Sequence, residues 1–285
     1  MQARLMFIHA LSPLHAGTGQ GVGIIDLPIA REKATGLPYL PGSSLKGSLR
    51  SACNDPAECK HVFGPDTGSA HEHAGAVQIA DQRLLLLPVR SLAGTFAWVT
   101  SPYVLRRFAR DALDVGLTEL PKVSDVADKT KAQICSTSVL TAHQDKIYLE
   151  DLDLAKDQTG DEWARWIGTN LFPTDNNWQT MLVERFCIVH DDILGFLLNT
   201  ATEITARIRL QEDTKTVATG GLWYEEALPA ETVLAGLVLA TPNNGKARPD
   251  EVFRVIQRLT GQPLQLGGKM TIGRGLCRVQ MLKGA

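Results

Sequence analysis

Four consecutive leucines, Leu84–Leu87, constrain the fold of this chain more than any other feature. They lie within the stretch GAVQIADQRLLLLPVR (75–90), and an apolar run of this kind predicts a strand that is buried on both faces. The 285 residues are 44% hydrophobic, which is enough to form a core around such a strand. We therefore expect a folded protein with an interior sheet rather than a disordered chain.

Strand-like and helix-like patterns alternate irregularly around this run. Strands are expected at 3–9, within 75–90, at 186–189, as a hairpin over 202–219, at 229–240 and at the C-terminus. Helices are expected at 41–53, 101–113, around Trp163 and Trp166, after 191–192, and at 248–261. This order is typical of the α+β class rather than of a regular doubly wound fold.

Two of the helix candidates carry more detailed expectations. Ser43 or Ser44 is placed to cap the first turn of the helix at 41–53. In the helix at 101–113, Tyr103, Phe108 and Leu113 are the candidates for apolar contacts.

Composition limits the classes of function. The net charge is −2, so an RNA ligand would need a local basic surface rather than a global positive field. The sequence shows no signal peptide and no apolar run near the roughly 18 residues of a membrane span, which predicts no membrane partner. Five scattered cysteines are typical of reduced thiols, and we expect a cytoplasmic protein.

A glycine-rich loop near the N-terminus holds a lone carboxylate. Glycines at 17, 19, 21 and 23 indicate unusual backbone angles, and Asp26 follows them within an apolar run. Such a carboxylate is solvated, hydrogen-bonded, or used to organise a metal or a reacting group. His15, in the same loop, is a candidate acid or base.

Two segments have the residue types that bind phosphate. GGKMTIGRG (267–275) can offer backbone amides together with Lys269 and Arg274, although a simple hairpin turn explains its glycines equally well. SSLKGSLR (43–50) sets hydroxyls and two basic residues at a helix start, where phosphates bind readily. On physics alone, a capped surface helix is the simpler interpretation of the second segment.

Three further groups of residues are weaker candidates. Cys53, Cys59, His61, His71 and His73 suggest zinc, but five residues between the cysteines exceed the usual spacing, and a flexible loop without metal is favoured. The acidic pair at 191–192 is expected at a turn or helix cap. The WYEE segment (223–226) offers aromatic rings that either stack on bases or pack on a sheet.

Together these segments resemble the RAMP superfamily, and within it the backbone subunit of the Cmr (type III-B CRISPR) effector complex. The matching residues follow the family's order over nearly the whole chain, and the region at about 117–186 matches least. The matching segments are HAGTGQGVGIIDLPIAREKATGLPYLPGSSLKGSLR (15–50), VFGP (62–65), HAGAVQIADQRLLLLPVRSLAGTFAWVTSPYVLRRF (73–108), RIRLQEDTKTVATGGLWYEEALP (207–229) and LGGKMTIGRG (266–275).

The resemblance implies a single RAMP domain over 1–285. Its fold would be a modified ferredoxin-like or RRM-like palm with an inserted β-hairpin thumb at about 203–228, and with an insertion at about 117–186. Copies of the chain would stack along a CRISPR guide RNA beside other Cmr subunits. Each thumb would splay a base pair of the guide–target duplex, and the bound target RNA would be cleaved at regular intervals.

The resemblance also implies roles for individual residues. The family's catalytic aspartate maps onto Asp26, which would act with a divalent cation, Mg²⁺ or Mn²⁺, either by holding the metal or by orienting the nucleophile. His15 is a less specific catalytic candidate. Trp223, Tyr224 and Glu225 match the thumb and target region. Residues matching guide-RNA contacts are Ser43, Ser44, Lys46, Arg50, Gly267, Gly268, Lys269, Gly273 and Arg274.

Three other functions compete with this one. The chain could be a binding scaffold without cleavage, or a metal-independent endonuclease that processes the guide precursor with His15 as general base. A general RRM-like RNA-binding module is the third, and it should bind isolated RNA with strong salt dependence. The near-neutral net charge counts against the third.

Overall fold

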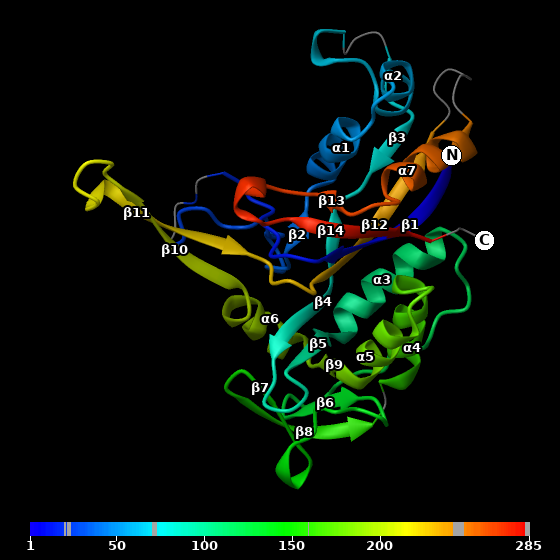
Figure 1. The fold of residues 1–285 in the computed structure, drawn as a ribbon. Coiled ribbons are helices and arrows are strands. Elements are labelled where there is room, and N and C mark those ends of the chain that lie inside the picture. The colour runs from blue at the N-terminus through cyan, green and yellow to red at the C-terminus, as the bar shows by residue number, and fades with distance from the viewer. Residues whose placement is uncertain (20, 22–23, 70–72, 159, 242–247, 283–285) are drawn as a thin grey trace.

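The computed structural model describes residues 1–19, 21, 24–69, 73–158, 160–241 and 248–282 (Figure 1). Of the residues considered above, Gly23 and His71 lie outside these ranges. The helices are α1 (Gly42–Ser51), α2 (Pro56–Phe63), α3 (Pro102–Asp114), α4 (Asp161–Leu171), α5 (Asn176–Arg185), α6 (Asp191–Thr200) and α7 (Pro249–Leu259).

The strands of the described residues are more numerous and form two sheets. They are β1 (Gln2–Ala10), β2 (Tyr39–Leu40), β3 (Val77–Ile79), β4 (Gln82–Arg90), β5 (Phe96–Thr100), β6 (Lys131–Ile134), β7 (Lys146–Leu149), β8 (Leu152–Gln158), β9 (Phe186–Val189), β10 (Glu203–Leu210), β11 (Val217–Ala227), β12 (Val233–Ala240), β13 (Leu264–Gln265) and β14 (Leu276–Met281). The irregular order of strands and helices confirms the α+β prediction.

One sheet of twelve strands organises the molecule. Its main path runs β13-β14-β1-β12-β4-β5-β9-β6-β8-β7, so the first strand of the chain lies between two of the last, β12 and β14. Leu84–Leu87 of β4 are 4% exposed or less, which confirms the strand buried on both faces. The helix α3 contacts β1, β4 and β12 and covers this central part of the sheet.

The amphipathic helix α3 only partly follows the expected contacts. Phe108 is buried, and its ring stacks on Phe7 of β1 with the centroids 5.7 Å apart. Tyr103 and Leu113 are 40% and 54% exposed, so the prediction that they make core contacts is wrong. The Tyr103 ring instead lies beside the Arg107 guanidinium.

The start of α1 also differs from the prediction. Neither serine caps the helix: the N-cap position is Pro41, without a side-chain cap. The carboxylate of Asp81, in the turn between β3 and β4, accepts a hydrogen bond of 2.9 Å from the Gly42 amide instead. A residue distant in sequence therefore caps this helix end, which a local pattern could not reveal.

Part of the cysteine-rich segment (53–73) is helical: α2 occupies Pro56–Phe63, where a flexible loop was expected. Asp55 accepts hydrogen bonds from the amides at 57 and 58, and Pro56 occupies the first turn, so α2 starts with a strong cap. Cys53 and Cys59 form a disulfide, so the prediction of reduced thiols is wrong for this pair. The other three cysteines are free and buried.

The region at 117–186 lengthens the main sheet. Its strands β6, β7 and β8 join β9 beyond β5, and α4 and α5 contact each other beside them (Figure 1). The pairs β5–β9 and β6–β8 are parallel, so each joins segments that are distant in sequence. At the end of β9, His190 caps α6, while the Asp191 carboxylate accepts a hydrogen bond from the Tyr103 amide at the start of α3.

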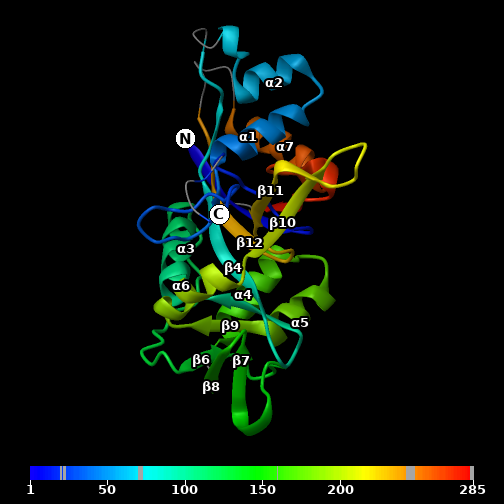
Figure 2. The same ribbon diagram turned by 90° about the vertical axis from the view of Figure 1, so that its left-hand side faces the viewer.

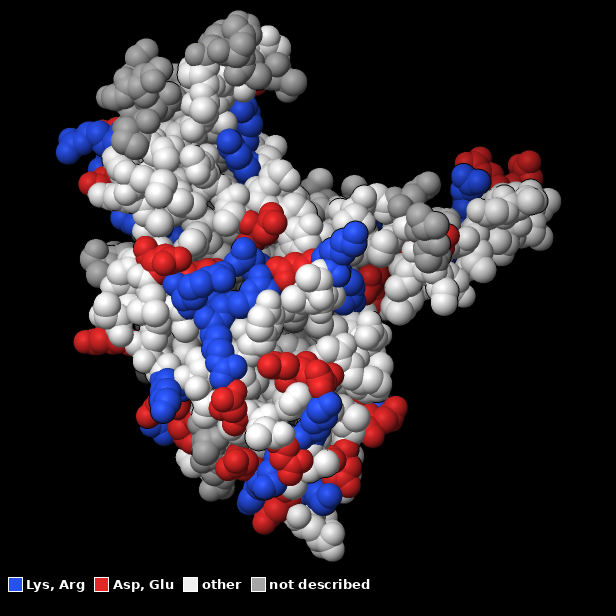
Figure 3. Space-filling model, turned by 180° about the vertical axis from the view of Figure 1, so that it is seen from behind, with Lys and Arg blue, Asp and Glu red and all other residues white. Residues whose placement is uncertain are grey.

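The strands β10 and β11 form a separate hairpin that projects from the body (Figures 1 and 2). From behind, this arm is mostly neither acidic nor basic, with charged side chains near its tip (Figure 3). Its exposed apolar side chains are Ile204, Ile208, Leu210, Val217, Leu222 and Tyr224, each between 39% and 54% exposed. Within the described ranges, no helix has the length and apolar character needed to cross a membrane.

Candidate active site

Asp26 lies at the base of the projecting hairpin. Its Oδ2 accepts a hydrogen bond of 2.7 Å from the Tyr224 amide of β11. Leu27 continues this contact, since its amide donates to the Tyr224 carbonyl and its carbonyl accepts from the Glu226 amide. The loop after the glycines is thus held along β11 by backbone bonds, and the exposed Asp26 carboxylate keeps Oδ1 without a hydrogen-bond partner among the described residues.

A polar cleft of about 460 Å³ opens beside this carboxylate. Three segments that are far apart in sequence line it, namely the glycine-rich loop, β11 and the segment after β13. The lining residues are Gly21, Asp26, Leu27, Gly220, Leu222, Trp223 and Lys269. The structure therefore brings two predicted groups, the catalytic aspartate and the WYEE segment, to one site.

Glu225 lies behind two residues of the cleft wall, Lys269 and Trp223, and is almost completely buried, at 1% exposed. Its Oε1 accepts hydrogen bonds from Lys269 Nζ at 2.7 Å and from the Trp223 indole at 2.8 Å. Arg207 Nε of β10 lies 3.4 Å from its Oε2. Burial raises the pKa of Glu225, but these hydrogen bonds and the two positive charges outweigh it and lower the pKa to about 2.

His15 lies beside β11 and is buried, at 7% exposed. Its Nδ1 is 2.6 Å from the Glu226 carbonyl oxygen, which can only accept, so Nδ1 carries the proton. In the neutral ring, Nε2 is then the basic atom. A Cβ on Gly17 would lie 2.5 Å from Nε2, so the glycine at 17 keeps that nitrogen open.

The glycine-rich C-terminal segment packs against His15. The Gly268 amide donates a hydrogen bond of 2.9 Å to the His15 carbonyl, and Gly267, with φ +70°, approaches the same oxygen too closely for any side chain. Arg274 is buried and donates to Thr205 Oγ1 of β10. Gly273 lies in open space. The segment thus joins β10, β11 and the His15 loop.

Glu226, which the sequence analysis did not single out, braces the Asp26 loop from inside. Its carboxylate is buried and accepts hydrogen bonds from Arg31 at 2.6 Å, Thr202 at 3.0 Å and the Ile29 amide at 3.1 Å. Two adjacent acids in one strand point to opposite faces, so each needs its own partners. That alternation is the sequence signal that could have pointed to Glu226 as well as to Glu225.

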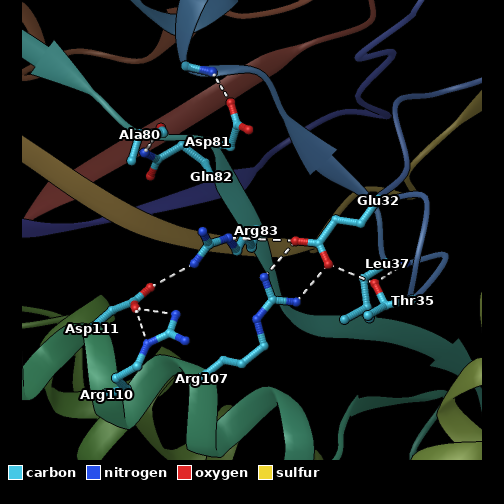
Figure 4. Close-up of polar contacts among 11 residues, drawn as sticks. Glu32, Thr35, Leu37, Ala80, Asp81, Gln82, Arg83, Arg107, Arg110 and Asp111 are labelled. Carbon is cyan, nitrogen blue, oxygen red and sulfur yellow. Dashed lines mark hydrogen bonds and ion pairs between the residues drawn. The ribbon is translucent and has the colours of Figure 1, made fainter.

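A second group of ion pairs holds Glu32, the residue that follows Arg31. Figure 4 shows Glu32 between two arginines: Arg107 of α3 donates to both its carboxylate oxygens at 2.6 and 2.7 Å, and Arg83 of β4 lies 3.6 Å away. Arg83 also donates to Asp111. The hydrogen bonds from Arg107 lower the pKa of Glu32 more than burial raises it. The chain beyond Asp26 is therefore fixed to the main sheet.

The predicted guide-contact residues of α1 lie apart from this cleft. Arg50 donates to the carbonyls of Gly64 and Pro65 and to Asp66, so it fastens the end of α2. Lys46 has no hydrogen-bond or ion-pair partner among the described residues. Its pKa is lowered, first by burial and then by the positive charge of Arg50.

Candidate metal ligands are few. Among the described residues, no group of three or more His, Cys, Asp and Glu side chains could hold a metal ion. At the cleft, Asp26 Oδ1 is the available carboxylate oxygen. Glu225 is buried, with Oε1 bonded to Lys269 and Trp223 and with Oε2 facing Arg207 Nε at 3.4 Å.

Comparison with known proteins places this geometry in a family. The model of the RAMP superfamily matches residues 7–278. Over 298 residues the chain is 37% identical to the CRISPR system Cmr endoribonuclease Cmr4 of Pyrococcus furiosus, covering 99% of this chain and 96% of that protein. It is 26% identical to the CRISPR system CMR subunit Cmr4 of Saccharolobus solfataricus, covering 97% and 95%.

Solved structures agree. The crystal structure of oligomeric Cmr4 from Pyrococcus furiosus matches with a TM-score of 0.75 and 28% identity, over 99% of this chain and 98% of that one. A chain in the cryo-EM structure of the type III-B Cmr-beta complex bound to cognate target RNA also gives a TM-score of 0.75, over 99% and 97% of the two chains. At 21% identity, this second likeness shows the fold alone.

Proposed function

Because this chain belongs to the RAMP superfamily, we propose that it is a backbone subunit of a type III-B CRISPR ribonucleoprotein and that it cleaves target RNA. The observation that carries the proposal is the exposed carboxylate of Asp26 in a polar cleft at the hairpin base. The relative at 37% identity is a Cmr endoribonuclease, which supports the same activity here. The complex acts in the cytoplasm.

The architecture supports a palm-and-thumb arrangement. The main sheet with α3 forms a ferredoxin-like palm, and β10–β11 is its thumb. The thumb exposes apolar side chains of the kind that mark interaction surfaces on other proteins. In the complex, copies of the chain stack along the guide RNA beside other Cmr subunits, and each thumb enters the guide–target duplex.

The guide RNA contacts α1 and the C-terminal glycine segment. Lys46 supports this assignment, since a half-buried ammonium without a carboxylate partner is suited to a phosphate. Ser43 and Ser44 lie one turn away, at the start of the same helix. The open space beside Gly273 would let its backbone approach the sugar–phosphate chain.

Cleavage would occur at a splayed nucleotide beside Asp26. A regular A-form helix does not place the 2′-hydroxyl in line with the leaving oxygen, and splaying the base relieves that restriction. The unpaired Oδ1 of Asp26 can then accept a hydrogen bond from the 2′-hydroxyl and orient it for attack. His15, whose Nε2 is kept open by Gly17, is the second candidate for moving a proton.

The donor set at the cleft fits a divalent cation that is shared with the RNA. Mg²⁺ is commonly held by one or two carboxylates together with substrate phosphates. In this alternative role, Asp26 would hold Mg²⁺ or Mn²⁺ jointly with the bound target instead of orienting the 2′-hydroxyl. Such a cation supplies Lewis-acid stabilisation of the phosphoryl oxygens.

The test is cleavage of a labelled target RNA by the reconstituted guide complex, with target binding measured in parallel. Wild type, Asp26→Ala and wild type in EDTA are compared. We expect regularly spaced products that disappear in both perturbed samples while binding persists. Unchanged cleavage by Asp26→Ala would reduce this chain to a scaffold. Cleavage that resists EDTA but is lost in His15→Ala would favour a metal-independent endonuclease.

A further inference from the structure

The basic residue that lines the Asp26 cleft belongs to a segment whose expected partner is the guide RNA. Lys269 lies in the glycine-rich segment, which resembles a guide-contacting loop, yet its side chain lines the same cleft as Asp26. Among the described residues that line this cleft, it is the only basic one. Its position therefore calls for an explanation other than guide binding.

Several contacts fix Lys269 in this place. Its backbone has a positive φ of 69°, a conformation that a residue with a side chain adopts only when its surroundings hold it. The amide of Gly268, the preceding residue, is bonded to the His15 carbonyl, and the Lys269 ammonium is bonded to the buried Glu225 carboxylate at 2.7 Å. Both the backbone and the side chain are thus positioned before any RNA arrives.

The ion pair leaves the ammonium able to bind a second anion. The Lys269 side chain is 30% exposed, whereas the Glu225 side chain is 2% exposed. An ammonium has three donors, and within the described structure Glu225 takes one of them. Trp223 and Arg207 lie against the same carboxylate, so Glu225 keeps its own partners when Lys269 also contacts RNA.

We infer that Lys269 is a catalytic residue whose ammonium binds the scissile phosphate of the target RNA opposite Asp26, and that Glu225 is its positioning residue. The inference rests on the proposed function. When O2′ attacks phosphorus, the O2′–P bond forms and the P–O5′ bond breaks. The 2′-hydroxyl proton leaves to a base, and O5′ takes up a proton. Negative charge grows on the non-bridging oxygens, where a preorganised ammonium stabilises it.

The test uses single-turnover cleavage by the reconstituted guide complex. Lys269→Met removes the charge and keeps the length of the side chain, and we expect the cleavage rate to fall about 100-fold. Lys269→Arg should recover at least a tenth of the wild-type rate. Lys146→Met is the matched control, because Lys146 of β7 forms a similar ion pair with Asp153 at 2.8 Å outside the cleft.

A second readout separates catalysis from guide binding. Guide incorporation, and affinity for a target with a 2′-deoxy sugar at each cleavage position, should stay within about threefold in Lys269→Met, since a transition-state contact leaves ground-state binding intact. A parallel loss of guide incorporation or target affinity would overturn the inference in favour of guide binding. An unchanged cleavage rate would overturn it as well.

Glu225→Gln tests the positioning role. The neutral amide keeps a hydrogen-bond acceptor but loses the charge that holds Lys269. We expect a slower cleavage rate with the deoxy-target affinity unchanged, and no additional loss in the double variant with Lys269→Met. Fully additive losses would contradict the positioning role. Asp26→Ala run alongside keeps the two proposals distinct: if that variant cleaves normally, the proposed nuclease function fails, whatever Lys269 does.

Discussion

The base and the tip of the projecting hairpin differ in which side chains they bury and which they expose. At its base, Glu225 and Glu226 are buried, and each is surrounded by donors from other segments. Toward its tip, apolar side chains such as Leu210 and Val217 are about half exposed and lack cover from the described chain. The base is therefore complete within one subunit, whereas the outer half is suited to contact with other molecules.

The largest expected effect comes from breaking the base. Glu226→Ala removes the acceptor of the Ile29 amide and the only carboxylate that pairs with Arg31 in the described structure, which then keeps two carbonyl acceptors. Removing one partner of a buried pair costs about 4 kcal/mol of unfolding free energy. Equilibrium urea unfolding measures this loss. Glu212→Ala, at an exposed position of the hairpin turn, should change stability by less than about 0.5 kcal/mol. Equal losses of stability in the two variants would contradict the stated difference between the base and the tip of the hairpin.

Acid should weaken the base in a specific pH range. The pKa of Glu225 is about 2 in the fold, against the ordinary value of 4.5 for an unperturbed glutamate. Its contribution to stability is therefore complete above about pH 4.5 and is lost as the pH falls toward 2. Between about pH 5 and pH 2, wild type should lose about 3 kcal/mol more than Glu225→Gln. Parallel stability curves for the two proteins would show that the carboxylate is not charged and paired in the fold.

The contact between the glycine segment and His15 offers a smaller perturbation. Gly267→Ala introduces a methyl group against the His15 carbonyl and should cost about 2 kcal/mol. Gly273→Ala is the matched control, because Gly273 also has a positive φ, of 81°, but its side-chain position is open. We expect about 1 kcal/mol there, from backbone conformation alone. Thermal unfolding of both variants separates the steric cost of the added methyl group from the cost of a positive φ in alanine.

The smallest effect on stability is expected at the tip. Leu210→Ser combined with Val217→Ser should lower the unfolding free energy by about 1 kcal/mol, since the two residues pair across the hairpin but each side chain is already about half exposed. The same variant should assemble poorly into the guide complex, which native mass spectrometry would detect. Normal assembly would mean that the exposed apolar side chains of the tip are not contact residues.

Local patterns in the sequence predicted elements better than their pairing. The Leu84–Leu87 strand and the helix at 101–113 were found because burial and periodicity are local properties. The pairing of strands β6–β9 into the main sheet was not predicted, although a strand at 186–189 was. The parallel pairs β5–β9 and β6–β8 join strands that are separated by other elements of the chain. The α2 helix was not predicted, although Asp55 and Pro56 are a typical cap and first-turn residue. The cysteines and histidines around them were interpreted as a loop.

The candidate site shows the same limit. Asp26, Trp223 and Glu225 were identified from the sequence and share one location in the structure. Glu226 and Arg31 were missed because their importance comes from a contact between residues 195 positions apart. The charge of Lys269 and the family resemblance predicted a contact with the guide RNA. Its place in the Asp26 cleft, which underlies the inferred contact with the target RNA, depends on the fold and is not visible in the sequence.

The order of the sheet has a consequence for how the protein is made. β1 is enclosed by β12 and β14, and the cleft needs Asp26 from the first tenth of the chain and Lys269 from the last. A ribosome must therefore release nearly the entire polypeptide before the first strand finds its neighbours. Translation products that end before Lys269 will lack one wall of the cleft, even though they contain Asp26.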